Sequence, residues 1–229
     1  MYTRRGGVPL SQAPTRDELA KCAQCYSILE DAVAKAYRRL ALLTVVREVK
    51  PLLLYISYDS HKHSRVLRQI ARILSAKAKI DLEACRKHAG EAWRRVFESA
   101  LAMASRKEKV MVEELLSIIN DMERIESFAD EEHLTSISSR ILQLAPYGGN
   151  KELELCRAAL ELIAEDEERH ISILRKIKEI LINEEARWGV LTNSNAMTSK
   201  TVHVLSTFIL KTLPTRHTNS TRGRVPWKS

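Results

Sequence analysis

Two histidines stand where a helix would turn its side chains toward the protein interior. Apolar residues recur every three or four positions around His63 and again around His170, so each histidine shares a helix face with leucine and isoleucine residues. Glu167, three positions before His170, falls on the same face. A buried imidazole or carboxylate costs several kcal/mol unless it is paired, protonated or bound to a metal ion. These residues therefore indicate either a buried hydrogen-bonded pair or a metal site.

Two other helical patterns each carry one carboxylate in an apolar row. Glu30 interrupts such a row near the N-terminus, and Glu126 ends another in the middle of the chain. Glu131 and Glu132 are alternatives to Glu126, because the helix that carries them could break near residue 130. Three carboxylates and two histidines at one level of a core would best share the cost of burial around a cation. In a four-helix bundle, such a set is typical of di-iron and di-manganese carboxylate sites.

The segment around His63 is repeated around His170. Without gaps, residues 53–74 match residues 160–181 at nine of 22 positions, and the two histidines are one of the matches. A duplicated helical hairpin is the natural hypothesis. His61 lies two positions from the inward His63, so we expect it to face solvent.

The spacing of apolar residues predicts an all-α protein. We expect five helical patterns, over residues 16–48, 51–76, 80–105, 107–144 and 151–186. Thr15 and Glu18 have the spacing of a capping box at the first of them, and Pro51 suits the first turn of the second. The chain thus divides into a flexible arm (1–15), a helical bundle (16–188) and a basic tail that we expect to be disordered (189–229).

Taken in order, these motifs resemble those of the ferritin-like superfamily, and of its rubrerythrin-type members in particular. The likeness rests on "LEDAVAKAYRRL" around Glu30, on "IAEDEERHISIL" around Glu167 and His170, and on the weaker repeat around His63. It implies a four-helix bundle of two helical hairpins with an extra crossover helix. It also implies a pair of metal ions, iron with manganese or zinc as alternatives, that reacts with dioxygen or peroxide. Carried over by position, the implied metal ligands are Glu30, His63, Glu126, Glu167 and His170.

The second helix departs from the family pattern at Ser60, where the family has a bridging glutamate. Asp59 could approach a metal from a neighbouring angle, and Tyr58 or His61 could substitute in another register. Otherwise the site would hold one metal ion or none. A second hypothesis is therefore a non-catalytic helical interaction or scaffold protein with a degenerate metal site.

Cysteines and tyrosines supply further candidates. The four cysteines are expected to be reduced thiols, because the N-terminal sequence lacks the apolar region of a secretory signal. Cys22, Cys25, Cys85 and His88 could bind zinc if their two helices met, although thiols on helices are usually packing residues. Four tyrosines of the first two helices are expected to pack in the core: Tyr26, Tyr37, Tyr55 and Tyr58. Tyr37 is the best candidate for a hydroxyl donor beside a metal ligand.

The excess of basic residues lies in the C-terminal tail. The net charge is +8, but all 29 acidic residues and 30 of the 37 basic residues lie at or before Glu185. Because the body is nearly neutral, nucleic acid is not expected as a partner except through the tail, which gives a third functional hypothesis. No apolar run reaches the length of about 18 residues that a membrane span needs, and we expect a cytoplasmic protein. A second copy of the chain, in a homo-oligomer such as a dimer, stays open as a partner.

Overall fold

The computed structural model of the chain describes residues 15–76, 80–128 and 150–192. Within these ranges the protein is all-helical, as predicted, and the only extended pairing is a single bridge between Thr44 and Val110. The elements are α1 (Arg16–Leu43), the short 3-10 helix η1 (Arg47–Val49), α2 (Lys50–Leu74), α3 (Leu82–Ser105), α4 (Val112–Phe128) and α6 (Lys151–Thr192). None of these helices is both long and apolar enough to cross a membrane.

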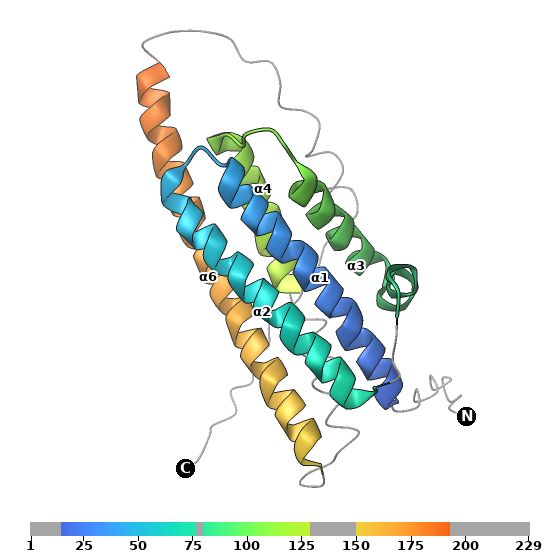
Figure 1. Ribbon diagram of the computed structural model, residues 1–229. Coiled ribbons are helices and arrows are strands. Elements are labelled where there is room, and N and C mark those ends of the chain that lie inside the picture. Colours follow the sequence, from blue (N-terminus) through green and yellow to red (C-terminus); the bar gives the residue numbers. More distant parts are fainter. Residues whose placement is uncertain (1–14, 77–79, 129–149, 193–229) are drawn as a thin grey trace, which may run out of the picture.

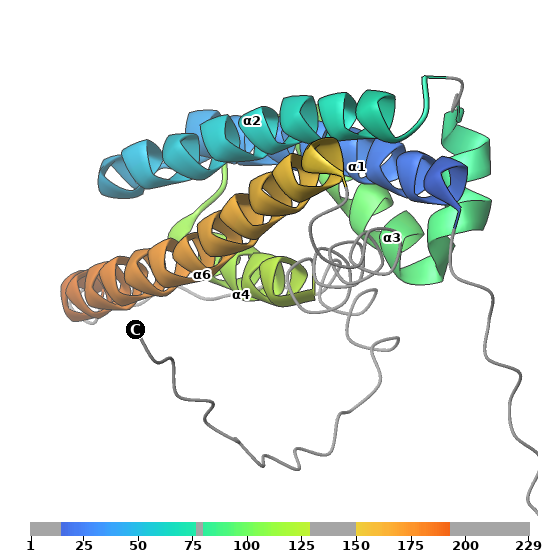
Figure 2. The ribbon, with the colours of Figure 1, turned by 90° about the horizontal axis from the view of Figure 1, so that it is seen from below.

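Four of the helices form two layers. In Figure 2, where the helices lie across the picture, α1 and α2 form one layer and α4 and α6 form the other. In Figure 1, α2 runs antiparallel to α1, and α6 runs antiparallel to α2. The helix α3 packs against α1, on the side away from α2. The core therefore lies between the layers, where all four helices direct apolar side chains.

Local sequence sets most of the helix ends. The predicted capping box is present, because the Thr15 side chain accepts a hydrogen bond from the Glu18 backbone while Glu18 accepts one from Thr15. Pro51 lies in the first turn of α2, as expected. In α3, Gly90 has a φ of 85° and joins two helical segments at a kink, a backbone conformation that glycine adopts at little cost.

Three helix ends differ from the prediction, and one of them is the start of α4, at Val112 instead of residue 107. The first helix stops at Leu43 instead of continuing to residue 48, because Val110 exchanges backbone hydrogen bonds with Leu43 and Val45 and draws the chain out of the helix. The last helix continues to Thr192, past the expected end at residue 186. The arm (1–14), residues 129–149 and the tail from 193 onward lie outside the described residues.

The predicted inward faces are buried. On α2 the buried positions include the whole predicted row, namely Leu53, Ile56, Ser60, His63, Leu67, Ile70 and Leu74, and on α6 the row from Leu153 to Leu181 is buried. His61 is exposed, as expected. The prediction for the tyrosines is correct for Tyr26 and Tyr37 but wrong for Tyr55 and Tyr58, which lie on the outer face of α2.

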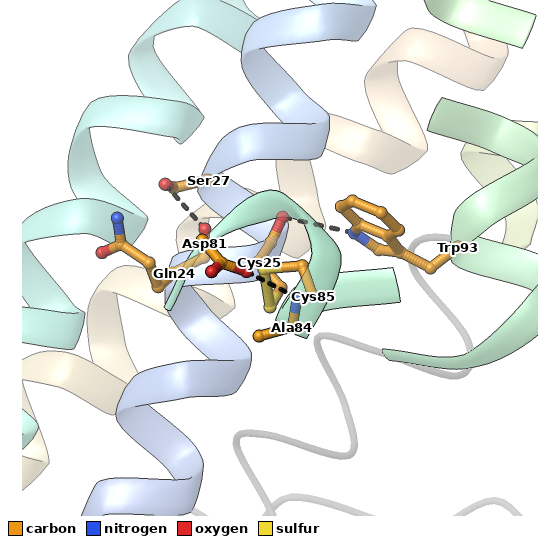
Figure 3. The surroundings of a disulfide bond; sticks show 7 residues. All are labelled: Gln24, Cys25, Ser27, Asp81, Ala84, Cys85 and Trp93. Carbon is orange, nitrogen blue, oxygen red and sulfur yellow. Dashed lines mark hydrogen bonds between the residues drawn. A yellow bond between two sulfur atoms is a disulfide. The ribbon is translucent and has the colours of Figure 1, made fainter. Parts of the chain in front are cut away.

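A disulfide bond attaches α3 to α1. Cys25 and Cys85 are 60 positions apart in the sequence, but their Cα atoms are separated by 5.3 Å and their sulfur atoms are bonded. As Figure 3 shows, the Nε1 of Trp93 donates a hydrogen bond to the carbonyl oxygen of Cys25 at 3.2 Å beside it. The expectation of four reduced thiols is therefore wrong for this pair. The disulfide also removes two of the thiolates that the hypothetical zinc site with Cys22 and His88 would need.

Candidate metal centre

Four helices bring the five candidate ligands together in the core. Glu30 comes from α1, His63 from α2, Glu126 from α4, and Glu167 and His170 from α6. They form two groups, in each of which the ligand atoms lie within 4.8 Å of one another. We call Glu30, His63 and Glu167 the Glu30 cluster, and Glu126, Glu167 and His170 the Glu126 cluster. Glu167 belongs to both clusters.

The two carboxylate oxygens of Glu167 face different histidines. Its Oε1 lies 2.8 Å from Nδ1 of His63, and its Oε2 lies 3.1 Å from Nδ1 of His170. Glu30 completes one side, with Oε2 at 3.9 Å from His63 Nδ1. Glu126 completes the other side, with Oε2 at 3.6 Å from His170 Nδ1. Each cluster therefore offers one imidazole nitrogen, one carboxylate of its own and one oxygen of a shared carboxylate.

Several of these atoms lack hydrogen-bond partners among the described residues. Six buried side-chain atoms of the centre are unpaired, namely Glu30 Oε2, Asp59 Oδ2, Ser60 Oγ, His63 Nδ1, Glu167 Oε1 and His170 Nε2. His63 Nδ1 and Glu167 Oε1 approach each other to 2.8 Å without the angles of a hydrogen bond. Buried polar atoms normally find partners. The three of these atoms that belong to the Glu30 cluster converge without bonding each other, which fits a common cation, so this donor set could hold a metal ion.

Two aspartates support the histidines from behind. Asp166 Oδ2 lies 3.1 Å from Nε2 of His63, and Asp59 Oδ2 lies 3.5 Å from Nε2 of His170. Each aspartate thus faces the histidine of the opposite helix, because α2 and α6 are antiparallel. The hydrogen bond with Asp166 favours the His63 tautomer that carries the proton on Nε2 and leaves Nδ1 available as a ligand, whereas Asp59 and His170 approach each other without a hydrogen bond.

The outer side of the aspartate pair is neutralised by cations. Lys62 Nζ lies 2.7 Å from oxygens of both Asp59 and Asp166, and Arg169 also pairs with Asp166. The two aspartates are therefore matched by two basic side chains at the surface of the bundle. Among the described residues, no lysine or arginine pairs with the inner carboxylates, which face the histidines instead.

Burial and mutual repulsion perturb the inner carboxyls in the metal-free protein. Burial, and then the neighbouring charge of Glu167, raises the pKa of Glu30 to about 8. Burial and the Glu126 charge also raise the pKa of Glu167. Burial disfavours the imidazolium of His170, but hydrogen bonds with Glu126 and Glu167 outweigh it and raise the His170 pKa to about 11. At neutral pH the metal-free centre therefore holds protons, and these protons supply the positive charge that bound metal ions would supply in their place.

Tyr37 anchors the Glu126 cluster. Its hydroxyl, buried in the core, donates a hydrogen bond of 2.5 Å to Oε1 of Glu126. The other oxygen of Glu126, Oε2, is the one that faces His170. Tyr37 therefore fixes the rotamer in which Glu126 points to the centre, in agreement with its prediction as a hydroxyl donor.

Replacing Tyr37 with phenylalanine should weaken one side of the centre. We expect the metal affinity of the Glu126 cluster to fall about 10- to 100-fold, the usual effect of losing a residue that orients a ligand, while the Glu30 cluster changes little. Titration of the metal-free protein with Co²⁺, followed by its visible absorption, would resolve the two steps. Tyr58→Phe, at an exposed position of α2, is the control, and equal loss at both steps would contradict the assignment.

The other predicted candidates lie elsewhere. Tyr58 and His61 face outward, so neither takes the place of the missing glutamate at Ser60. Asp59 faces Nε2 of His170 from the outer side instead of joining a cluster. Glu131 and Glu132 lie outside the described residues. Asp166 was not predicted, although the repeat aligns it with Asp59 and that alignment was a signal for it.

Comparison with known proteins adds no relative. No family model, curated protein or solved structure matches this chain.

Proposed function

We propose that the protein is a ferritin-like four-helix carboxylate protein that binds two metal ions, iron in the first place, and acts as an oxidoreductase on dioxygen or peroxide. The observation that carries this proposal is the position of Glu167, whose two oxygens face two different histidines. A carboxylate so placed is suited to bridge a pair of cations. Two buried clusters that share one glutamate are hard to explain as packing, because burying five ionisable groups together without a cation is costly.

Each residue has a distinct role in this proposal. Glu30, His63 and Glu167 would hold one metal ion, and Glu126, Glu167 and His170 would hold the other, with Nδ1 as the ligand atom of each histidine. The set of carboxylates and imidazoles favours iron or manganese, and zinc, which would bind without redox activity, is the less suited alternative. Bound iron would supply one-electron chemistry toward dioxygen or peroxide. The protein would supply a dry, shaped site in which Tyr37 holds Glu126 and Asp166 holds the imidazole of His63.

Reaction of the reduced, iron-loaded protein tests this function. Protein loaded with Fe²⁺ without oxygen would be mixed with hydrogen peroxide or with dissolved oxygen, and iron oxidation followed by absorbance. We expect oxidation faster than that of free Fe²⁺ in the same buffer, and loss of the acceleration in Glu167→Gln. Glu168→Gln, at the exposed neighbouring position, should behave like the wild type. Oxidation at the rate of free iron would contradict an oxidoreductase.

A scaffold protein with a degenerate metal site is the second candidate. Ser60, which stands where the family has a second bridging glutamate, is the observation that favours it. Under that hypothesis, the metal-free protein would be the functional form, and its stability would not respond to iron. The same oxidation experiment, together with a melting curve in the presence of iron, separates the two functions.

Metal uptake should depend on pH because protons must leave the centre. Glu30, with a pKa of about 8, and His170, with a pKa of about 11, are protonated at pH 7 in the metal-free protein. Metal binding therefore releases more than one proton, and the affinity should fall about tenfold per released proton for each pH unit below 8. Titrations in weakly buffered solution with an indicator dye would count the protons. An affinity that does not change between pH 6 and 8 would contradict it.

The stability of the metal-free protein should show the matching trend. Both raised pKa values mean that the folded state holds protons that the unfolded chain releases. The Glu30 contribution to the free energy of unfolding is thus fully present below the ordinary glutamate pKa of about 4.5 and is lost as the pH rises through about 8, whereas the His170 contribution is fully present below about 6.5 and is lost as the pH rises through about 11. Urea unfolding at several pH values would measure this decline, and saturating metal should reduce it.

A further inference from the structure

We propose that Ser60 opens a coordination position for a small monoanion, the class that includes hydroperoxide, azide and formate, on the side of the metal pair opposite Glu167. This inference rests on the proposed function, since the anion would bind to the metals as well as to the serine. It assigns a role to Ser60, the position at which this chain lacks the bridging glutamate of the family pattern. The serine would then mark the place where the small substrate enters the centre.

The partners of the buried serines on α2 single out Ser60. Ser57 donates a hydrogen bond of 2.7 Å to the backbone carbonyl of Ala34, on α1. Ser64 donates one of 2.7 Å to the backbone carbonyl of Ser27, also on α1. Ser60 lies between them, is 1% exposed, and its Oγ has no hydrogen-bond partner among the described residues. A buried hydroxyl without a hydrogen-bond partner is energetically unfavourable. A ligand that accepts its proton would remove that cost.

The internal repeat places Ser60 at the centre. It aligns Ser60 with the bridging Glu167, just as it aligns His63 with His170. Ser60 also lies three positions before His63 on the same buried face of α2, as Glu167 does before His170 on α6. The two helices thus present a glutamate and a serine at corresponding places. A carboxylate fills one place, and the short side chain leaves the other to an exogenous ligand.

The charge of the centre favours an anion in that position. Three ionised carboxylates and two neutral histidines leave two divalent metals with one positive charge in excess. Asp59 and Asp166 do not cancel this charge, because Lys62 and Arg169 already pair with them. A buried excess charge is costly in a low-dielectric core. One bound monoanion would make the inner site neutral.

Azide binding to the Co²⁺-loaded protein tests the inference without relying on turnover. Azide should change the visible absorption of the wild type with saturation at one azide per two metals. Ser60→Glu supplies the carboxylate from within, so it should keep both metals and show no azide response. Ser60→Ala keeps the space but loses the hydroxyl, so it should bind azide about tenfold more weakly. Ser64→Ala removes a hydroxyl that donates its hydrogen bond to α1, so this variant should bind azide as the wild type does.

The outcomes separate this inference from the proposed function. If the wild type takes up two metals but does not bind azide, or if Ser60→Glu with two metals still binds it, the inference is overturned and the metal site stands. If Ser60→Glu does not fold, equal azide affinity in Ser60→Ala and the wild type overturns it. If the wild type takes up no metal, the proposed function fails and the inference fails with it.

Discussion

Glu167→Gln should prevent the protein from holding both metal ions at once, whereas Glu30→Gln and Glu126→Gln should each weaken one. Glu167 is the only residue shared by the two clusters, and its Oε1 and Oε2 face His63 and His170 separately. An amide has one carbonyl oxygen and a nitrogen that does not bind a cation, so it cannot serve both sides. Anaerobic titration with Co²⁺ or Fe²⁺, with the bound metal measured after gel filtration, would give the stoichiometry of each variant.

Two controls keep this result interpretable. Circular dichroism of the metal-free variants shows whether the helices remain, since a loss of fold would also lose the metal. Glu168→Gln removes the adjacent, exposed carboxylate and should leave two metals bound. Two metals in Glu167→Gln, at wild-type affinity, would show that this glutamate does not bridge them.

Loss of the Cys25–Cys85 disulfide should lower the free energy of unfolding by about 4 kcal/mol, since it closes a loop of 60 residues. The double variant Cys25→Ala/Cys85→Ala avoids leaving a free thiol, and urea unfolding measures the difference. The metal centre should survive, because its ligands lie on α1, α2, α4 and α6, whereas the disulfide attaches α3 to the side of α1. A phosphine reductant should reproduce the loss in the wild type.

A matched variant separates the covalent bond from packing. Cys156→Ala removes a buried cysteine that is not in a disulfide, so it should cost only the packing of one sulfur atom. A double variant no less stable than Cys156→Ala would contradict a disulfide in the native protein. Detection of four free thiols in the unfolded, unreduced chain would do the same.

The sequence was sufficient where periodicity alone decides the outcome. The inward rows of α2 and α6 follow from three- and four-residue spacing, and both rows are buried with their histidines. Those rows identified His63, Glu167 and His170, and the apolar rows of α1 and α4 identified Glu30 and Glu126, because a polar residue in an apolar row has few reasons to be there. The same reasoning put His61 outside and identified Tyr37 as a buried donor.

Contacts between helices could not be read in this way. The exchange in which Asp166 faces His63 and Asp59 faces His170 depends on the antiparallel register of α2 and α6, which no single helix encodes. The Cys25–Cys85 bond depends on how α3 docks on α1, and the spacing of cysteines carries no signal for that. Tyr58 was expected in the core together with the other tyrosines of the first two helices. Its own position on α2, however, faces outward.

Uptake of Fe²⁺ by metal-free wild-type protein, titrated without oxygen, tests the central claim most directly. A binding curve that breaks at two metals per chain, with a rise in melting temperature as the sites fill, is the result that the shared position of Glu167 predicts. A protein that takes up no iron and melts at the same temperature with and without it would contradict the claim.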